Sequence, residues 1–348
     1  MTTIQTTNPR PSTTDTAILF ATWSPGAEDD PLGTQNILLP LLDRPMLQCV
    51  VERLVRHGCT TLHVVLGDDP RPVKALLGDG TRWGCRIVWH QTVADEDFMG
   101  IMRRIGVRAE EDYVLAVASR MPLGDDSWPA RHGTAPSGRI DAWDGDGTAH
   151  WSGWGIFAGD WLLTRSISAS FTSFERAALQ DLTVARRYRP RPLSSEGPAE
   201  VLDSALRMLT AEPVRMRPGR GCEIHPSARL VEPVLIGQGV KIGADAVVGP
   251  NVVLGDGAFL DRGVQVRDSI VLPESYVGEG LELTDAVVRG KRLANVRLNT
   301  VIQVPDSHIL AWIPATVAGM LAPVRAEKVM AAVLRVVLAP LYCLARSL

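Results

Sequence analysis

The chain has 348 residues, of which 45% are hydrophobic and 22% charged, which is enough for two globular domains with ordinary cores. The formal net charge of −3 gives no electrostatic reason to expect a nucleic-acid partner. Five cysteines, with no CxxC pair and no metal-ligand spacing, indicate reduced thiols in a cytoplasmic protein.

The N-terminal half predicts an α/β domain. Residues 1–16 are polar and rich in Thr and Pro, which predicts a disordered segment without a signal peptide. Ala17–Trp23 and Leu62–Gly67 are apolar runs typical of buried strands. Between them, apolar residues recur at helical spacing over 46–55, and Gly58 follows as a helix C-cap. A second helix and a third strand are expected next, so the alternation predicts a parallel sheet with ligands at the carboxyl ends of its strands.

The C-terminal half carries a repeat of six residues. An aliphatic residue returns at every sixth position, namely Ile224, Leu230, Ile236, Ile242, Val248, Leu254, Leu260, Val266 and Leu272. This period fits neither an amphipathic helix nor one alternating strand, but it fits short parallel strands stacked as three sides of a coil. The segment resembles the hexapeptide-repeat family, which implies a left-handed parallel β-helix over residues 222–312.

The chain as a whole resembles the sugar-1-phosphate nucleotidyltransferases, which make nucleotide sugars. The matching segments are Leu38–Gly58, Val64–Asp69, Gly78–Gln91, Asp112–Val117, Gly153–Leu163 and Ser194–Leu209. The resemblance spans roughly residues 17–305. It implies an α/β fold with a Rossmann-like, GT-A-like nucleotidyltransferase domain over 17–215, followed by the left-handed β-helix.

The residues that serve chemistry in that family are replaced here. The Gly-rich phosphate loop corresponds to Trp23–Asp30, which keeps one glycine and carries three acidic residues, and the activating lysine falls near Gln35–Asn36. The two metal-binding aspartates align with Arg120 and Ser195. The segment that packs on the nucleotide base is represented by Asp97–Gly100. Five separate losses predict that nucleotidyl transfer is lost, with no metal and no cofactor bound.

A binding role survives these replacements. The alignment leaves as candidate ligand contacts Ser24, Gly26, Asn36, Gly100, Arg120 and Glu196. The expected ligand is a nucleotide or a sugar phosphate, and Arg120 is expected to bind its anionic group directly in place of the lost metal. Three tryptophans, Trp151, Trp154 and Trp161, fit either sugar stacking or an aromatic core.

The tail, residues 313–348, changes character. Glu327–Leu348 is apolar with isolated cations, of which Lys328, Arg335 and Arg346 fall on one side of a helical wheel. It also resembles the first membrane helix of bacterial phosphoglycosyl transferases. Its uncharged run is too short to cross a bilayer, so the pattern predicts an amphipathic helix that either lies on the inner membrane or packs on protein. Both alternatives stay open.

The leading hypothesis is a degenerate nucleotidyltransferase acting as a binding or scaffold subunit in bacterial envelope or exopolysaccharide production. Its expected partners are polysaccharide-synthesis proteins, the inner-membrane surface and further copies of the chain. One alternative is an active enzyme with relocated metal ligands, for which the candidates are Asp29, Asp30, Asp125 and Asp126. Another is a hexapeptide acyltransferase with His308 as general base, whereas His225 is expected to be a turn residue.

Overall fold

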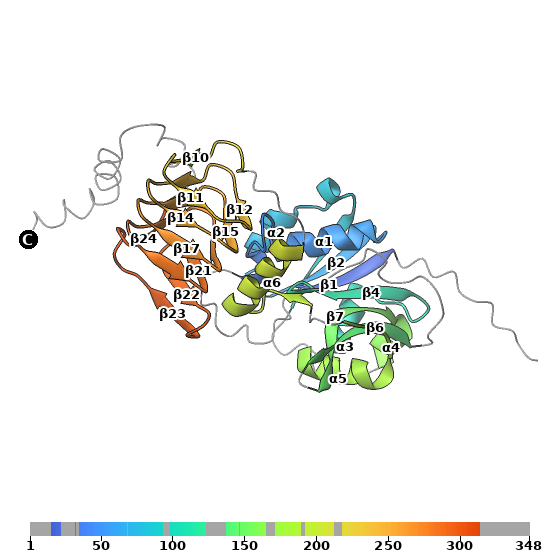
Figure 1. Ribbon diagram of the computed structural model, residues 1–348. Coiled ribbons are helices and arrows are strands. Elements are labelled where there is room, and N and C mark those ends of the chain that lie inside the picture. Colours follow the sequence, from blue (N-terminus) through green and yellow to red (C-terminus); the bar gives the residue numbers. More distant parts are fainter. Residues whose placement is uncertain are drawn as a thin grey trace, which may run out of the picture. The chain divides into compact units, whose positions relative to one another are not determined.

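The computed structural model describes residues 15–21, 32, 35–67, 69–92, 98–122, 137–145, 147–164, 171–188, 192–211 and 218–313. The chain divides into two compact units (Figure 1). One takes in Met1–Pro213 and Val296–Val301, and the other Val214–Asn295 and Ile302–Leu348. Nearly all of the expected disordered N-terminal segment and of the tail lies outside the described residues.

The first unit is built on a seven-stranded sheet with the order β3-β2-β1-β4-β7-β6-β8. Its strands are β1 (Thr16–Phe20), β2 (Thr61–Leu66), β3 (Arg86–Gln91), β4 (Asp112–Val117), β6 (Gly138–Gly145), β7 (Thr148–Ala158) and β8 (Thr183–Tyr188). Strands β1 to β4 are parallel, which confirms the parallel sheet predicted from the alternation of strands and helices. β7 then runs antiparallel to β4 and to β6.

Helices flank this sheet on both faces. They are α1 (Met46–Arg56), α2 (Arg71–Leu77), α3 (Phe98–Ile105), α4 (Gly159–Thr164), α5 (Phe171–Asp181) and α6 (Pro198–Ala211), with the short 3-10 helices η1 (Asn36–Leu38) and η2 (Thr81–Trp83). Alternate residues of β1 face opposite sides, so Leu19 joins the core under α1 while Ile18 and Phe20 join the core with α3. None of the described helices is long and apolar enough to span a bilayer.

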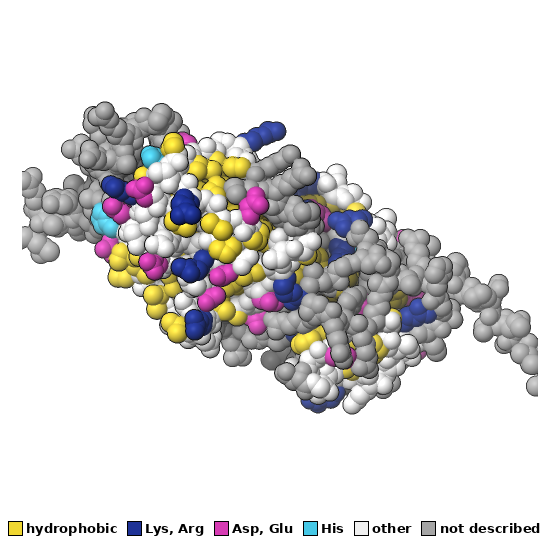
Figure 2. Space-filling view, in the orientation of Figure 1, with side chains coloured by type: hydrophobic (Ala, Val, Ile, Leu, Met, Phe, Trp, Pro, Cys, Tyr) yellow, Lys and Arg dark blue, Asp and Glu magenta, His cyan; other side chains and the backbone are white. Residues whose placement is uncertain are grey.

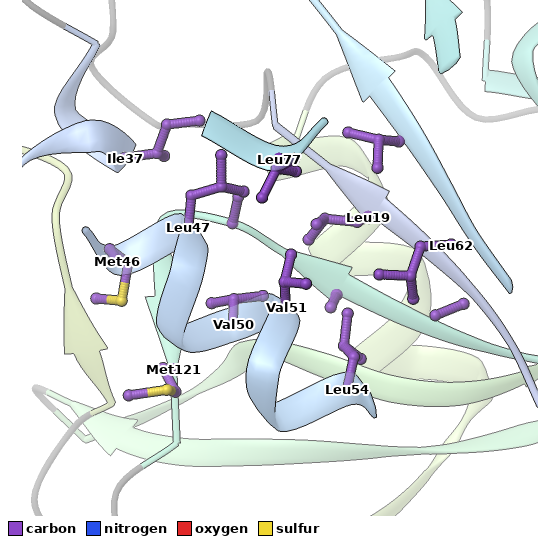
Figure 3. Packing of buried hydrophobic residues seen from close by; sticks show 14 of the residues in the cluster. Leu19, Ile37, Met46, Leu47, Val50, Val51, Leu54, Leu62, Leu77 and Met121 are labelled. Atoms are coloured by element: carbon purple, nitrogen blue, oxygen red, sulfur yellow. The ribbon is translucent and has the colours of Figure 1, made fainter. Parts of the chain in front are cut away.

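Helix α1 shows how the sequence pattern produces the packing. Figure 3 shows Leu47, Val51 and Leu54 of α1 packed with Leu19 and Leu62 of the sheet, and all five side chains are fully buried. The helix stops because Gly58 adopts a φ of 94°, which an L side chain rarely takes. The predicted helix with its glycine cap is therefore confirmed.

The second unit is a parallel β-helix of three sheets (Figure 1). One sheet holds β10 (Glu223–Ile224), β13 (Lys241–Ile242), β16 (Phe259–Leu260), β19 (Ser275–Val277) and β24 (Leu310–Trp312). The next holds β11 (Arg229–Leu230), β14 (Val247–Val248), β17 (Gln265–Arg267) and β20 (Glu282–Thr284). The third holds β12 (Val234–Ile236), β15 (Val252–Leu254), β18 (Ser269–Val271), β21 (Ala286–Arg289), β22 (Arg292–Asn295) and β23 (Thr300–Gln303).

The repeat of six residues does not continue to its predicted end. Leu254 pairs with Val271 rather than with Leu272, so Leu272 does not stack on Leu254 as the spacing of six predicts. The corner that takes Gly249–Asn251 in one coil takes only Arg267 and Asp268 in the next, which shortens the coil by one residue. Val271 therefore occupies the inward position that follows Leu254.

Two of the three sheets contain a reversed strand near their C-terminal end, and the third sheet continues past its reversed strand to β23. β24 pairs antiparallel with β19, and β22 pairs antiparallel with β21. The reversal closes the β-helix at its C-terminal end among the described residues.

Candidate functional site

The candidate site begins at the carboxyl ends of two central strands. β4 ends at Val117, and the next residue, Ala118, donates its N–H to the carbonyl of Phe20 at the end of β1 over 2.9 Å. The chain then forms the short strand β5 (Arg120–Met121), which pairs antiparallel with β9 (Leu193–Ser194). This is the edge at which a parallel sheet places its ligands.

The two positions that align with metal carboxylates are neighbours in space. Arg120 pairs in register with Ser194, and the N–H of Ser195 donates to the carbonyl of Ser119 over 2.9 Å. Residues separated by 75 positions in the sequence are thus brought together by β5 and β9.

Arg120 forms a two-point ion pair with Glu196. Its Nε lies 2.5 Å from Oε1 and its Nη2 lies 3.2 Å from Oε2 of that carboxylate. Only 13% of the Arg120 side chain and 15% of the Glu196 side chain are exposed, so water screens the pair weakly. At the position that aligns with the first metal-binding aspartate, this chain therefore has a cation, and a carboxylate already neutralises it.

The surrounding backbone fixes the arginine. Its Nη1 donates to the carbonyl of Trp151 over 3.1 Å, and the indole N–H of Trp154 donates to the carbonyl of Arg120 over 2.7 Å. Gly153 lies between the two tryptophans with a φ of 89°, and a Cβ there would stand 3.2 Å from the Cβ of Arg120. Glycine is needed here for both its conformation and its size.

Glu196 is held from its own side. Its N–H donates to Ser194 Oγ over 3.3 Å, and its carbonyl accepts the Nδ2 of Asn36, in η1, over 3.2 Å. The hydroxyl of Ser204, on α6, bonds the backbone N–H and carbonyl of Ser194 over 2.8 and 2.9 Å. The structure therefore brings together three of the candidate residues, Asn36, Arg120 and Glu196.

The donor set does not suit a divalent cation. Arginine offers only N–H donors, and the Ser195 hydroxyl, fully buried, has no hydrogen-bond partner among the described residues. Within the described part of the chain, no group of three or more His, Cys, Asp or Glu side chains is placed to hold a metal. The residues at the two aligned positions thus fail to form the family's metal site.

The remaining candidates lie elsewhere. Gly100 is in the first turn of α3. Ser24 and Gly26, together with the substitute ligands Asp29, Asp30, Asp125 and Asp126, fall outside the described residues. Sequence reasoning did not single out Ser119 or Gly153 as parts of the site. The conspicuous Gly-Trp-Gly segment was a signal for Gly153, because it brings two glycines and a large ring to one short stretch of strand.

The tryptophans and histidines take structural places. Trp151, Trp154 and Trp161 are 0%, 0% and 4% exposed, so they form an aromatic core instead of a stacking platform. His225 holds a turn, with its Nδ1 2.8 Å from Ser227 Oγ. His308 is exposed, and its backbone N–H donates to Asp306 Oδ1 over 2.8 Å.

Comparisons with known proteins bear mainly on the β-helix. Residues 230–324 match the family described as GMPPB C-terminal domain. A search of the curated proteins finds no match. Among solved structures, the chain is similar to a Bacillus anthracis protein named as a glucose-1-phosphate thymidylyltransferase, in complex with sucrose. That similarity has 12% identity and a TM-score of 0.47, and it covers 58% of this chain and 97% of the other. The family match supports, over residues 230–324, the sugar-phosphate nucleotidyltransferase family that the sequence resembles.

Proposed function

We propose that this chain is a nucleotidyltransferase-like protein that does not transfer nucleotidyl groups and acts as a binding or scaffold subunit in bacterial envelope or exopolysaccharide production. The observation that carries the proposal is the ion pair between Arg120 and Glu196. In the family that the sequence resembles, a cation bound by carboxylates belongs at this place.

The chemistry of nucleotidyl transfer explains why an arginine in place of a metal-binding carboxylate matters. Nucleotidyl transfer concentrates negative charge on phosphates, and a divalent cation offsets that charge in the transition state. A guanidinium could offer some of that charge, but Glu196 already neutralises it through two hydrogen bonds. A phosphate must therefore displace the Glu196 carboxylate before it reaches Arg120. The free energy lost with that ion pair offsets much of the free energy gained from the contact with phosphate.

This geometry adds an expectation about how the ligand predicted from the sequence would bind. A nucleotide or sugar phosphate that reaches Arg120 is expected to release Glu196, so binding opens the link between β5 and the segment after β9. Such a ligand-dependent change suits a subunit that reports on a metabolite to partner proteins of polysaccharide synthesis. The proposed contact with the inner-membrane surface rests on the tail sequence, which lies outside the described residues.

The deciding experiment is a pyrophosphate-release assay. Purified full-length protein is incubated with a panel of sugar 1-phosphates, each nucleoside triphosphate, and Mg²⁺ or Mn²⁺. No release is expected above the protein-free rate. Release that depends on both substrates together would overturn the proposal in favour of an active enzyme with relocated ligands.

Binding is measured separately by thermal shift with the same compounds and without metal. A ligand at about 100 times its dissociation constant raises the free energy of unfolding by about 2.7 kcal/mol. The matched control is Arg120→Gln, which keeps a polar side chain but removes the charge. A ligand whose shift survives this substitution does not bind at Arg120.

A further inference from the structure

Apolar side chains are exposed towards the C-terminal end of the described chain, in the β-helix and in the segment Val296–Val301 that belongs to the first unit. Six large hydrophobic side chains are exposed among the described residues, and five of them lie between Leu298 and Trp312. The two that matter here are Ile302 of β23, 47% exposed, and Trp312 of β24, 62% exposed. All four residues of β23 are exposed. Large rings and branched chains held in water are costly unless a partner covers them.

A turn that carries cations lies beside these side chains. A Cβ on Gly290 would stand 3.1 Å from the Cβ of Trp312, so the turn between β21 and β22 packs on that residue. The N–H of Val304 donates to the carbonyl of Lys291 over 2.8 Å, and Lys291 Nζ donates to the carbonyl of Pro305 over 3.1 Å. The chain just after Ile302 is thereby tied to the same turn. We call Arg289, Lys291, Arg292, Ile302 and Trp312 the terminal patch.

The turn and the strands around it carry more cations than carboxylates. Residues 286–305 contain four cations, at Arg289, Lys291, Arg292 and Arg297, and no carboxylate. Asp285 and Asp306 flank this stretch; Asp306 caps the backbone of His308, and Glu274 Oε2 accepts the Trp312 indole N–H over 3.0 Å. Figure 2 shows hydrophobic side chains gathered towards this end of the β-helix, with both Lys or Arg and Asp or Glu side chains beside them.

We propose that the terminal patch is a contact surface for an anionic lipid bilayer. Tryptophan suits the boundary between headgroups and acyl chains, because its ring is apolar and its N–H is polar. Cations around such a ring gain from the negative surface potential of the leaflet, while aliphatic side chains gain from leaving water.

Charge favours this partner over the other two that could cover the patch. A second copy bound through the same surface would bring cations against cations. The chain's own tail, residues 314–348, carries Arg325, Lys328, Arg335 and Arg346 against a single acid, Glu327, so it repels the patch as well. An anionic leaflet complements the patch and the tail together.

The test is sedimentation of full-length protein with vesicles. Vesicles of phosphatidylcholine containing phosphatidylglycerol are compared with vesicles of phosphatidylcholine alone, and binding is expected only to the first. The double variant Lys291→Gln, Arg292→Gln should lower the partition coefficient by roughly 25-fold, at about fivefold for each cation removed. Ile302→Ser should lower it further at high salt, where the apolar contribution remains.

The controls change charge and hydrophobicity equally elsewhere on the β-helix. Arg229→Gln with Arg262→Gln removes two cations, and Val231→Ser removes an exposed aliphatic side chain, 38% exposed, from an early coil. These variants should bind as the unchanged protein does. Melting temperatures of all variants are recorded, so that loss of binding through unfolding is recognised.

A second measurement tests whether the Trp312 indole enters the bilayer. Phosphatidylglycerol brominated in its acyl chains should quench part of the tryptophan fluorescence, and Trp312→Phe should remove that quenched part. The proposal is overturned if the patch variants pellet as the unchanged protein does, if the control pair loses binding equally, or if quenching survives Trp312→Phe. A change of oligomeric mass in Ile302→Ser without loss of vesicle binding would assign the patch to a second copy instead.

Discussion

The imidazoles of His63 and His90 are joined across neighbouring strands, with 2.8 Å between Nδ1 of the first and Nε2 of the second. Their rings are stacked with centroids 5.1 Å apart. Burial lowers the pKa of His90 to about 4, assisted by His63 and by Arg104 on α3, and burial together with Arg86 lowers the pKa of His63. A hydrogen bond between two imidazoles requires at least one of them to be neutral.

We expect acid to destabilise the first unit through this pair. Both pKa values are lower in the folded state than the ordinary value of about 6.5, so the folded protein binds fewer protons than the unfolded chain. The contribution is complete above about pH 6.5 and is lost as the pH falls towards the folded pKa of about 4. Melting temperatures measured from pH 7 to pH 5 should therefore decline.

The variant His90→Gln keeps a polar group but cannot titrate, so its melting temperature should depend less on pH over the same range. The control is His308→Gln, which removes an exposed histidine and should leave the pH dependence unchanged. Equal slopes for all three proteins would assign the acid sensitivity to other groups.

Removing the partner of Arg120 should destabilise the protein. Glu196→Gln leaves a weakly exposed guanidinium without a compensating charge, at an expected cost of about 2–3 kcal/mol in the free energy of unfolding. Chemical denaturation monitored by circular dichroism measures this. Glu52→Gln, which disrupts the more exposed pair with Arg44, should cost no more than about 1 kcal/mol.

A double replacement separates charge from packing. Arg120→Met with Glu196→Leu removes both charges and keeps most of the volume, so it should recover stability relative to Glu196→Gln. If the double variant is less stable than both the unchanged protein and Glu196→Gln, the hydrogen bonds of Arg120 to the backbone matter more than the pairing of charge.

Restoring the carboxylates should restore metal binding but not turnover. Arg120→Asp with Ser195→Asp puts one carboxylate on β5 and one directly after β9, and we expect Mn²⁺ affinity to rise by roughly tenfold or more. Isothermal titration calorimetry measures it, with Arg120→Asp alone as the control. Pyrophosphate release should stay absent, because neither the Gly-rich loop nor the lysine is restored. No gain in affinity would contradict the alignment of these two positions with metal ligands.

The β-helix offers a matched pair of substitutions on one strand. Val248→Asp places a carboxylate in the core between Leu230 and Val266, and should cost several kcal/mol in the free energy of unfolding. Val247→Asp alters the preceding residue, which is only half-buried and lies outside that core, so its cost should be small. Similar melting temperatures for the two variants would show that the assigned register is wrong.

The fold was predictable wherever a repeat in the sequence matches a repeat in the structure. Helical spacing located α1, and the period of six located the β-helix. The period failed at Leu272 because corners can lose a residue without disturbing the stack: Asn251 and Asp268 both adopt positive φ, and their side chains remain bonded over 2.8 Å. A corner's length depends on such contacts between coils, which no periodicity records.

The candidate site was less predictable. The alignment identified Arg120 and Glu196 singly, but it assigned Arg120 to a ligand and not to the carboxylate with which it pairs. Their contact depends on the pairing of β5 with β9, two strands of two residues each, too short to show any alternation. Gly153 and Trp154 reach the arginine through a strand antiparallel to β4, and a pattern of parallel strand and helix does not anticipate that strand.

The reversed strand β24 at the end of the β-helix has a consequence for continued stacking. A parallel coil ends in the same row of N–H and C=O groups that its own next coil would bind, so it is a template for growth by any chain with the same period. β24 is the last strand of its sheet and is reversed against β19, so it presents its hydrogen-bonding groups in the opposite direction. On that sheet a further coil cannot continue the parallel pairing of the coils before it, so β24 ends the regular stack there among the described residues.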